Sequence, residues 1–174
     1  MLIEKDKSSL YIIDVQEKLV SVMPKPHRFI DNIIKLQKAA NILEVPITLS
    51  EQYPKGLGIT IDKIRDNKKK TVIEKTDFSL VKNCSSKIGN NIIICGIEAH
   101  VCVLQTGIEF ADANMKVYVV QDAISSRYEK DYLMALSRLD KHPNIQIVSC
   151  EMVLFEWLRT SDHPDFKTIS QLIK

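Results

Sequence analysis

Short runs of apolar residues alternate along this chain with longer segments in which apolar residues recur every three or four positions. The first pattern is typical of buried strands, and the second is typical of helices that bury one face. Strands are predicted over Ser9 to Val15, Pro46 to Leu49, Thr71 to Ile73, Ile92 to Cys95, Val117 to Val120, and Ile145 to Val148. The main helices are predicted over Phe29 to Glu44, Val101 to Phe110, Lys130 to Asp140, Met152 to Leu158, and Phe166 to Ile173.

Shorter segments connect these elements. Proline and glycine between Ser50 and Gly58 predict a long loop, which we expect to lie on the substrate side of the molecule. A single helical turn is expected over Ile59 to Ile64. Ser79 is expected to cap a short helix that ends near Cys84.

The alternation of strands and helices predicts an α/β fold, in which helices cover both faces of a six-stranded, mostly parallel sheet. No repeat or linker divides the 174 residues, so we expect one domain over residues 1–174. Ligands of such folds bind outside the carboxyl ends of the strands. Asp14, Lys75 and Cys102 all follow predicted strands, and the sequence therefore places three reactive side chains at one rim.

Cys102 lies in the first turn of a predicted helix, just after a buried strand and a break at Gly96. The positive end of the helix dipole and the free backbone N–H groups there favour the thiolate, which is the nucleophilic form of cysteine. A second interpretation is open, because a cysteine between two valines is often a packing residue. Lys75, judged by itself, is most typical of a surface lysine.

Composition and charge argue against nucleic-acid binding, membrane insertion and cofactor binding. Hydrophobic residues make up 45% and charged residues 26% of the chain, which is ordinary for a globular protein. The net charge of +2, with scattered basic residues, gives no case for a nucleic-acid partner. No apolar run reaches the roughly 18 residues of a membrane span, and the amino terminus lacks a signal-peptide pattern, so a cytoplasmic protein is expected. No glycine-rich phosphate loop follows the first strand, and no cofactor is expected.

The cysteines and histidines do not form a recognisable framework. Four cysteines, Cys84, Cys95, Cys102 and Cys150, are too irregularly spaced for a set of disulfides. The histidines show none of the spacings typical of zinc ligands, so no metal is expected.

Three motifs, taken together, resemble the isochorismatase-like cysteine hydrolases. They are Ile13-Asp14-Val15-Gln16, the segment from Glu74 to Ser79, and the segment from Gly96 to Val103. That superfamily includes nicotinamidases, carbamoylsarcosine amidases and isochorismatases. The loop from Ser50 to Gly58 and the tail from Met152 to Lys174 are most similar to the small isochorismatase-domain proteins. The resemblance covers nearly the whole chain and implies the isochorismatase-like hydrolase fold.

The resemblance implies a catalytic triad of Asp14, Lys75 and Cys102. Cys102 would attack a small amide or related carbon–nitrogen substrate to form a thioester, with Asp14 moving the proton and Lys75 stabilising the charges. The family's oxyanion hole would be formed by the backbone N–H groups of Glu98 and Cys102, beside a cis peptide bond between Ile97 and Glu98. Related enzymes often have threonine or alanine at the position of Glu98.

Further residues near the rim are candidates for a substrate pocket, although a structural role is open for each of them. They are Gln16, Tyr53, Thr76, Phe78 and His100. Nicotinamidases carry an aspartate and histidines after the second strand as metal ligands, whereas this chain has Ser50, Glu51 and Gln52 there. The resemblance therefore also implies that the metal site is absent.

Two other functional classes are weighed beside the cysteine hydrolase. One is a non-catalytic interaction protein that works through assembly, and the other is a zinc hydrolase that uses the Glu51 loop. The apolar segment from Met152 to Leu158 predicts a subunit contact in a homo-oligomer, with an internal core helix as the alternative. If Cys102 is ionised, iodoacetamide should label it selectively, and Asp14→Asn or Lys75→Ala should slow that labelling.

Overall fold

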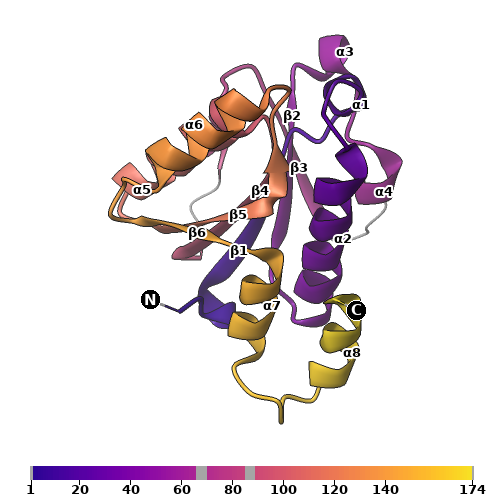
Figure 1. Cartoon of the computed structure of the whole chain (residues 1–174), viewed down its shortest axis with the longest axis vertical. Helices are drawn as coiled ribbons and strands as arrows, with labels where there is room; N and C mark the ends of the chain where they lie inside the picture. Colours follow the sequence, from indigo (N-terminus) through magenta and orange to yellow (C-terminus); the bar gives the residue numbers. More distant parts are fainter. Residues whose placement is uncertain (1, 66–69, 85–88, 174) are drawn as a thin grey trace.

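The computed structural model describes residues 2–65, 70–84 and 89–173, so residues 1, 66–69, 85–88 and 174 of the expected domain lie outside it. A six-stranded sheet runs through its centre in the order β3-β2-β1-β4-β5-β6 (Figure 1). The strands are β1 (Ser8–Ile13), β2 (Ile47–Gln52), β3 (Lys70–Lys75), β4 (Asn91–Ile97), β5 (Lys116–Ser125) and β6 (Ile145–Val148). All five pairings are parallel, which is stricter than the mostly parallel sheet that the sequence predicted.

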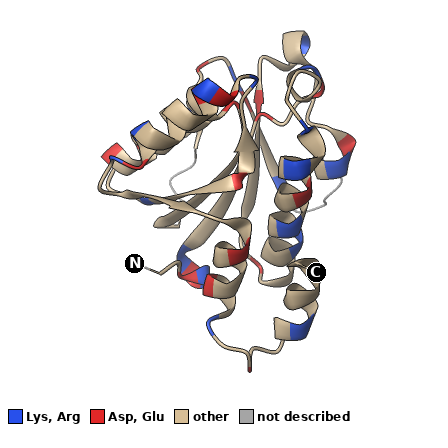
Figure 2. Ribbon diagram, viewed as in Figure 1, with Lys and Arg blue, Asp and Glu red and all other residues tan. Residues whose placement is uncertain are grey.

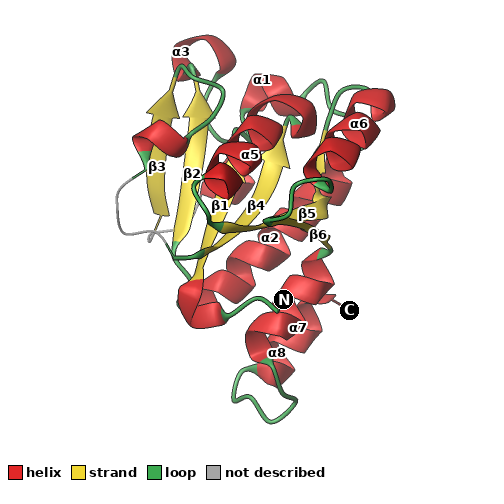
Figure 3. Cartoon of the chain, turned by 90° about the vertical axis from the view of Figure 1, so that its left-hand side faces the viewer, coloured by secondary structure: helices red, strands yellow, loops and turns green. Residues whose placement is uncertain are grey.

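Helices lie on both faces of the sheet, which confirms the predicted α/β fold (Figures 1 and 3). One face is covered by α2 (Pro26–Ile42), α7 (Cys150–Leu158) and α8 (Phe166–Ser170), and the other by α5 (Leu104–Asp112) and α6 (Glu129–Leu139). Shorter helices are α1 (Glu17–Val20), α3 (Pro54–Leu57) and α4 (Asp62–Arg65). Single turns are η1 (Lys5–Lys7), η2 (Val81–Asn83), η3 (Ala99–Val103) and η4 (Gln171–Ile173).

Two hydrophobic cores follow from the alternation of side chains along the strands. In β1, Leu10 and Ile12 face the α2 and α7 side, while Tyr11 and Ile13 face the α5 and α6 side. Since β1 lies in the middle of the sheet, it is buried on both faces. Charged residues lie mainly on the helices and connections around this apolar centre (Figure 2).

Several boundaries differ from the sequence prediction, and three of them concern the site. β2 continues to Gln52, β3 ends at Lys75, and β5 extends to Ser125. In all three cases hydrogen bonds to a neighbouring strand extend the strand past its apolar run. The apolar pattern of the sequence gives no information about these hydrogen bonds. The predicted loop after Leu49 therefore begins with strand residues and contains the short helix α3.

Helix α7 is mainly an internal core helix, which was the alternative to the predicted subunit contact. Val153, Leu154, Trp157 and Leu158 are buried in the core beside α2 and β1. Only Met152 and Phe155 expose large parts of their apolar side chains. Among the described residues, no helix combines the length and the apolar character that a bilayer crossing requires.

Candidate active site

The carboxyl ends of β1, β3 and β4 bring together the three residues that the sequence singled out. Asp14 directly follows β1, Lys75 is the last residue of β3, and Cys102 lies in the turn η3 that follows β4. Parallel strands end at the same edge of a sheet, so residues distant in the sequence meet there. In Figure 3 this edge is the one at which the strand arrows point towards α1 and α3.

Asp14 and Lys75 form a buried ion pair. Lys75 Nζ lies 2.8 Å from Asp14 Oδ2, and both side chains are fully buried. The other carboxylate oxygen, Oδ1, accepts a hydrogen bond of 2.6 Å from the hydroxyl of Ser50. A buried carboxylate is stable only with such partners, and here both of its oxygens have one.

Gln52 completes the surroundings of Lys75 and was not singled out from the sequence. The ammonium group has three N–H donors, and they reach Asp14, the side-chain oxygen of Gln52 at 2.7 Å, and the carbonyl of Phe78 at 3.0 Å. The sheet register pairs Gln52 directly with Lys75. The register could not be read from the apolar pattern, because that pattern ended the second strand at Leu49.

Cys102 is 6% exposed and interacts with both members of the ion pair. Burial raises the pKa of its thiol above the ordinary range, the Asp14 carboxylate raises this pKa further, and the Lys75 ammonium lowers it only in part. Burial and Asp14 therefore oppose the resting thiolate that the sequence suggested, and Lys75 favours it. The helix dipole argument considered only the local turn, whereas burial and the nearby carboxylate come from the tertiary structure.

The turn before Cys102 has the backbone geometry that the resemblance implied. The peptide bond between Ile97 and Glu98 is cis, which confirms that prediction. The chain then forms the π-helical turn η3, with Cys102 inside it, before α5 begins. Gly96 has a φ of 114°, and a Cβ atom there would overlap the backbone of Ile13 on the adjacent strand. Only glycine fits this close approach between β4 and β1.

Glu98 forms a second ion pair beside this turn. Its carboxylate oxygen Oε2 accepts hydrogen bonds from the backbone N–H of Arg127 at 3.0 Å and from Arg127 Nε at 3.1 Å. His100 is joined to the same connection, with its Nδ1 lying 3.0 Å from the hydroxyl of Ser126. Arg127 was also missed from the sequence, where its position after the fifth strand was the one available signal.

The predicted pocket residues divide into two groups. Gln16 is fully buried, and its side-chain amide donates to the carbonyls of Gln52 and Gly58 and accepts from the backbone N–H of Gln52. These contacts favour the structural role that was left open for Gln16. Tyr53, Thr76 and Phe78 are exposed around the rim, and His100 is half-buried.

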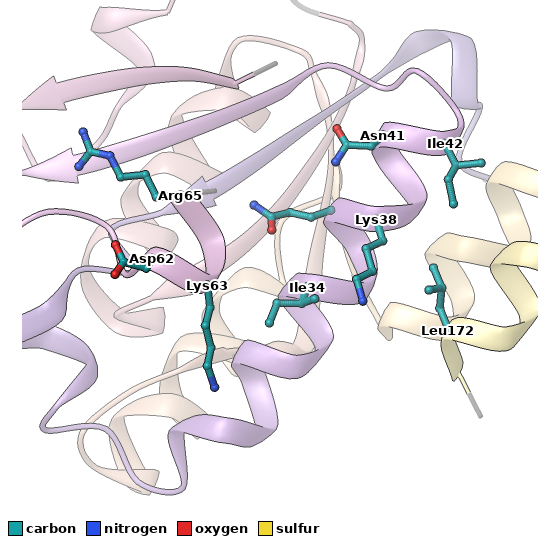
Figure 4. A pocket seen from close by; sticks show the side chains of 9 residues that line it. Ile34, Lys38, Asn41, Ile42, Asp62, Lys63, Arg65 and Leu172 are labelled. Atoms are coloured by element: carbon teal, nitrogen blue, oxygen red, sulfur yellow. The ribbon is translucent and has the colours of Figure 1, made fainter. Parts of the chain in front are cut away.

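Two hollows in the surface differ in how many of the predicted pocket residues line them. Thr76 and Phe78 contribute to a small one of about 280 Å³ beside α5. A larger one, of about 1010 Å³, lies between α2, α4 and the carboxyl-terminal turn, away from Cys102 (Figure 4). Its lining includes Lys38, Lys63 and Leu172.

The residues after β2 have structural partners. The Glu51 carboxylate is buried and accepts from the backbone N–H of Thr60 at 2.8 Å and from Arg65 at 3.2 Å. Among the described residues, no group of three or more histidine, cysteine, aspartate and glutamate side chains is arranged to hold a metal ion. Ser50 and Gln52 bond instead to Asp14 and Lys75.

The fold and this rim define a class of protein, the α/β proteins with a parallel sheet and a buried thiol, acid and lysine at its carboxyl edge. The model of the isochorismatase domain matches residues 8–151, and the chain belongs to the isochorismatase family. It is 32% identical to isochorismatase domain-containing protein 2 of Rattus norvegicus, over 97% of this chain and 82% of that protein.

Solved structures agree with this assignment. The chain superposes on a structure named MAR1 ribonuclease from Caenorhabditis elegans with a TM-score of 0.93 and 35% identity, covering 99% of this chain and 92% of the other. It also resembles the fold of the YcaC product of Escherichia coli, described as an octameric hydrolase of unknown specificity, with a TM-score of 0.84 and 20% identity. The coverage is 98% of this chain and 95% of that one.

Proposed function

We propose that this protein is a cysteine hydrolase that cleaves a small amide or a related carbon–nitrogen bond without a metal. The observation that carries the proposal is that Cys102 interacts electrostatically with Asp14 and Lys75, which form an ion pair at the carboxyl edge of the sheet. A thiol, a base within reach of its proton and a fixed cation are the parts that nucleophilic acyl transfer requires. Membership of the isochorismatase family supports hydrolase chemistry.

The first half-reaction follows from these contacts. In the proposed reaction the Cys102 thiol begins protonated, and the Asp14 carboxylate takes the proton from Sγ as the sulfur bonds to the substrate carbonyl carbon. The negative charge passes to the carbonyl oxygen, and the backbone N–H groups of Glu98 and Cys102 are the proposed donors to it. Asp14 then gives its proton to the nitrogen as the carbon–nitrogen bond breaks, which leaves a thioester on Cys102 and releases the amine.

The second half-reaction restores the site. Asp14 removes a proton from water as the water oxygen attacks the thioester. The carbon–sulfur bond then breaks, Asp14 returns the proton to Sγ, and the carboxylic acid leaves. Lys75 carries the compensating positive charge throughout. Its bonds to Gln52 and Phe78 hold the ammonium in place when the charge on Asp14 is transiently neutralised.

The test is a screen of small primary amides and carbamoyl compounds for ammonia release, with Cys102→Ala as the inactive control. For any substrate found, mass spectrometry of the quenched reaction should show an acyl adduct on Cys102. Ammonia release that persists in Cys102→Ala would contradict the proposal.

A second candidate is cleavage of RNA, which is favoured by the name ribonuclease that the Caenorhabditis elegans protein carries at 35% identity to this chain. An assay of RNA breakdown distinguishes the ribonuclease from the amide hydrolase. RNA breakdown by purified protein, lost in both Cys102→Ala and Lys75→Ala, would favour the ribonuclease. Breakdown that survives both substitutions would point to a contaminating nuclease.

A third candidate is an oligomeric protein that works through assembly. The burial of Cys102 is compatible with it, and the exposed side chains of Leu2, Met152 and Phe155 line a hollow of about 540 Å³ together with Glu151, Glu156 and Arg159. Light scattering of the protein and of Phe155→Glu would show whether this surface joins subunits. Assembly with no reaction of Cys102 towards any amide would favour this candidate over the hydrolase.

A further inference from the structure

The hollow of about 1010 Å³ beside α2 lies on the side of β2 opposite the proposed active site. The side chains of Ser50 and Gln52 reach the buried ion pair at that site, whereas Glu51, between them, bonds to Arg65 on α4. Successive residues of a strand point to opposite faces of the sheet, so Glu51 faces the α2 side. Arg65 lines the hollow, which the proposed hydrolytic mechanism does not use.

Two lysines of this hollow have no acidic partner. Lys38 comes from α2 and Lys63 from α4, and both are exposed. Within residues 2–65, 70–84 and 89–173, neither ammonium group forms an ion pair or a hydrogen bond. Asp62 also lines the hollow, but in the same described ranges it is paired with neither lysine. An anion between the two ammonium groups would therefore be attracted by two uncompensated charges.

Arg65 adds a third cation, which is fixed in place. Its Nη1 donates to the buried Glu51 carboxylate at 3.2 Å, and 41% of the Arg65 side chain remains accessible. In the described part of the chain, Nε and Nη2 of Arg65 have no hydrogen-bond partner. Since Glu51 offsets the charge of Arg65, the guanidinium contributes unpaired N–H donors more than net charge.

The rest of the lining is apolar, apart from polar side chains that include a buried amide. Ile34, Ile42 and Leu172 are partly buried and pack against the core on the α2 side of the sheet. Gln37 is 2% exposed, and its amide nitrogen donates to the carbonyl of Ile64. Its amide oxygen accepts no hydrogen bond from the residues that the structure describes, and it is not sealed inside the protein. A ligand with an N–H or O–H group would give this oxygen a partner.

Charged and apolar side chains alternate around the hollow. Figure 4 shows Lys38 and Lys63 extending on the two sides of Ile34, and Leu172 approaching α2 from the carboxyl-terminal turn. Ile34 and Lys38 share one face of α2, because they are four residues apart in a helix. A ligand can therefore place an anionic group near the ammonium groups while its apolar part covers Ile34 and Leu172.

We propose that this hollow binds a small organic phosphate, with the phosphate held by Lys38 and Lys63 and the organic part against the apolar lining. Phosphate is favoured over a single carboxylate, because its three terminal oxygens can accept from both lysines and from the unpaired N–H groups of Arg65. The amide oxygen of Gln37 favours an organic part that carries a hydrogen-bond donor. This site is separate from Cys102, and the inference does not depend on the proposed hydrolase function.

The test is isothermal titration calorimetry with two probes, adenosine monophosphate (AMP) and phenyl phosphate. Each is compared with its counterpart without phosphate, which is adenosine or phenol. We expect both phosphates to bind, and the counterparts to bind at least about tenfold more weakly, the order of magnitude of one charged hydrogen bond. AMP should bind more tightly than phenyl phosphate, because its amino group can donate to Gln37.

Lys38→Gln and Lys63→Gln should each weaken AMP binding about tenfold, and both leave the Glu51–Arg65 ion pair in place. The matched control is Lys141→Gln, which removes the same charge from an exposed lysine after α6, and AMP binding should not change. Unchanged AMP binding in the double variant Lys38→Gln/Lys63→Gln would overturn the inference. So would equal binding of AMP and adenosine, or the failure of both phosphates to bind the unaltered protein.

Cys102→Ala separates this site from the proposed active site. AMP should bind Cys102→Ala as tightly as it binds the unaltered protein, because the hollow lies on the other face of β2. AMP binding that disappears in Cys102→Ala would place the nucleotide at the active site and overturn the inference. AMP binding that depends on Lys38 and Lys63, in a protein that cleaves no amide, would support this site and count against the hydrolase alone.

Discussion

At the scale of single residues, the site depends on how each charge at the rim is compensated. Asp14 has Ser50 and Lys75, and Lys75 has three acceptors. Asp14 raises the pKa of the Cys102 thiol, and Lys75 lowers it. The reactivity of the sulfur is therefore a property of the group and not of the turn in which it lies.

Asp14 and Lys75 should have opposite effects on the alkylation of Cys102. Asp14→Asn removes a negative charge that raises the pKa of the thiol, so labelling by iodoacetamide near neutral pH should become faster. Lys75→Ala removes the group that lowers this pKa, and labelling should become slower. The rates are measured by mass spectrometry across a pH series.

This expectation reverses the sign that the sequence alone suggested for Asp14→Asn. Both variants should lose hydrolysis, because Asp14 moves the proton and Lys75 carries the compensating charge. Ser50→Ala is the matched control, since it removes a partner of Asp14 and leaves both charges in place. Slower labelling in Asp14→Asn would contradict the proposed electrostatic balance.

At the scale of elements, the carboxyl ends of the strands are held in register by polar side chains. Gln16 follows β1 and joins it to the end of β2 and to Gly58 beyond α3. The backbone groups that it satisfies belong to Gln52, the last residue of β2, and to Gly58 after α3. One amide side chain thus keeps the Gln52 backbone in place while the Gln52 side chain bonds to Lys75.

Gln16→Leu should destabilise the protein by about 1 to 3 kcal/mol, because it leaves backbone donors and acceptors without partners. The measurement is the free energy of unfolding in urea. Gln37→Leu is a matched control, since Gln37 is also buried but donates a single hydrogen bond, to the carbonyl of Ile64. Equal losses in the two variants would contradict the role assigned to Gln16.

At the scale of the whole molecule, several thiols and a tyrosine hydroxyl are buried in the two cores or pack against them, where the neutral form is favoured. Burial raises the pKa of Cys84 to about 11 and that of Cys150 to about 12. It also raises the pKa values of Cys95, Cys102 and Tyr11. Folding therefore keeps protons on thiols that an unfolded chain would release at a lower pH.

The free energy of unfolding should fall as the pH rises from about 7.5 to about 9.5. Unfolded cysteines lose their protons near pH 8.5, whereas the folded ones keep them until their raised pKa values are reached, so alkaline pH favours the unfolded state. The stabilisation is complete below the pKa of the unfolded thiols and is lost above it.

Urea unfolding at several pH values measures this loss of stability, and reducing conditions keep the thiols free. Cys84→Ser should flatten the decline, because one of the titrating thiols is removed. A constant or rising free energy of unfolding over this range would contradict the assigned burial of the thiols.

Much of the architecture could be predicted because the information is local. The strand runs, the helix periodicity and the glycine at position 96 all appear in short windows of sequence. The motifs around Asp14, Lys75 and Cys102 also supported the cis peptide before Glu98, which the structure contains. The roles of Gln52 and Arg127 were missed, because their partners are 23 and 29 residues away in the chain.

The sequence by itself therefore determined the order of the elements, the parallel α/β class and the three reactive residues at strand ends. Apolar periodicity and the position of a residue after a strand carry that information, since both depend on neighbouring positions. Only the tertiary structure decided which side chains surround Lys75, that Gln16 ties a loop and that Glu98 holds Arg127. It also decided the direction in which the pKa of Cys102 shifts, because burial and nearby charges depend on segments that meet only when the sheet has formed.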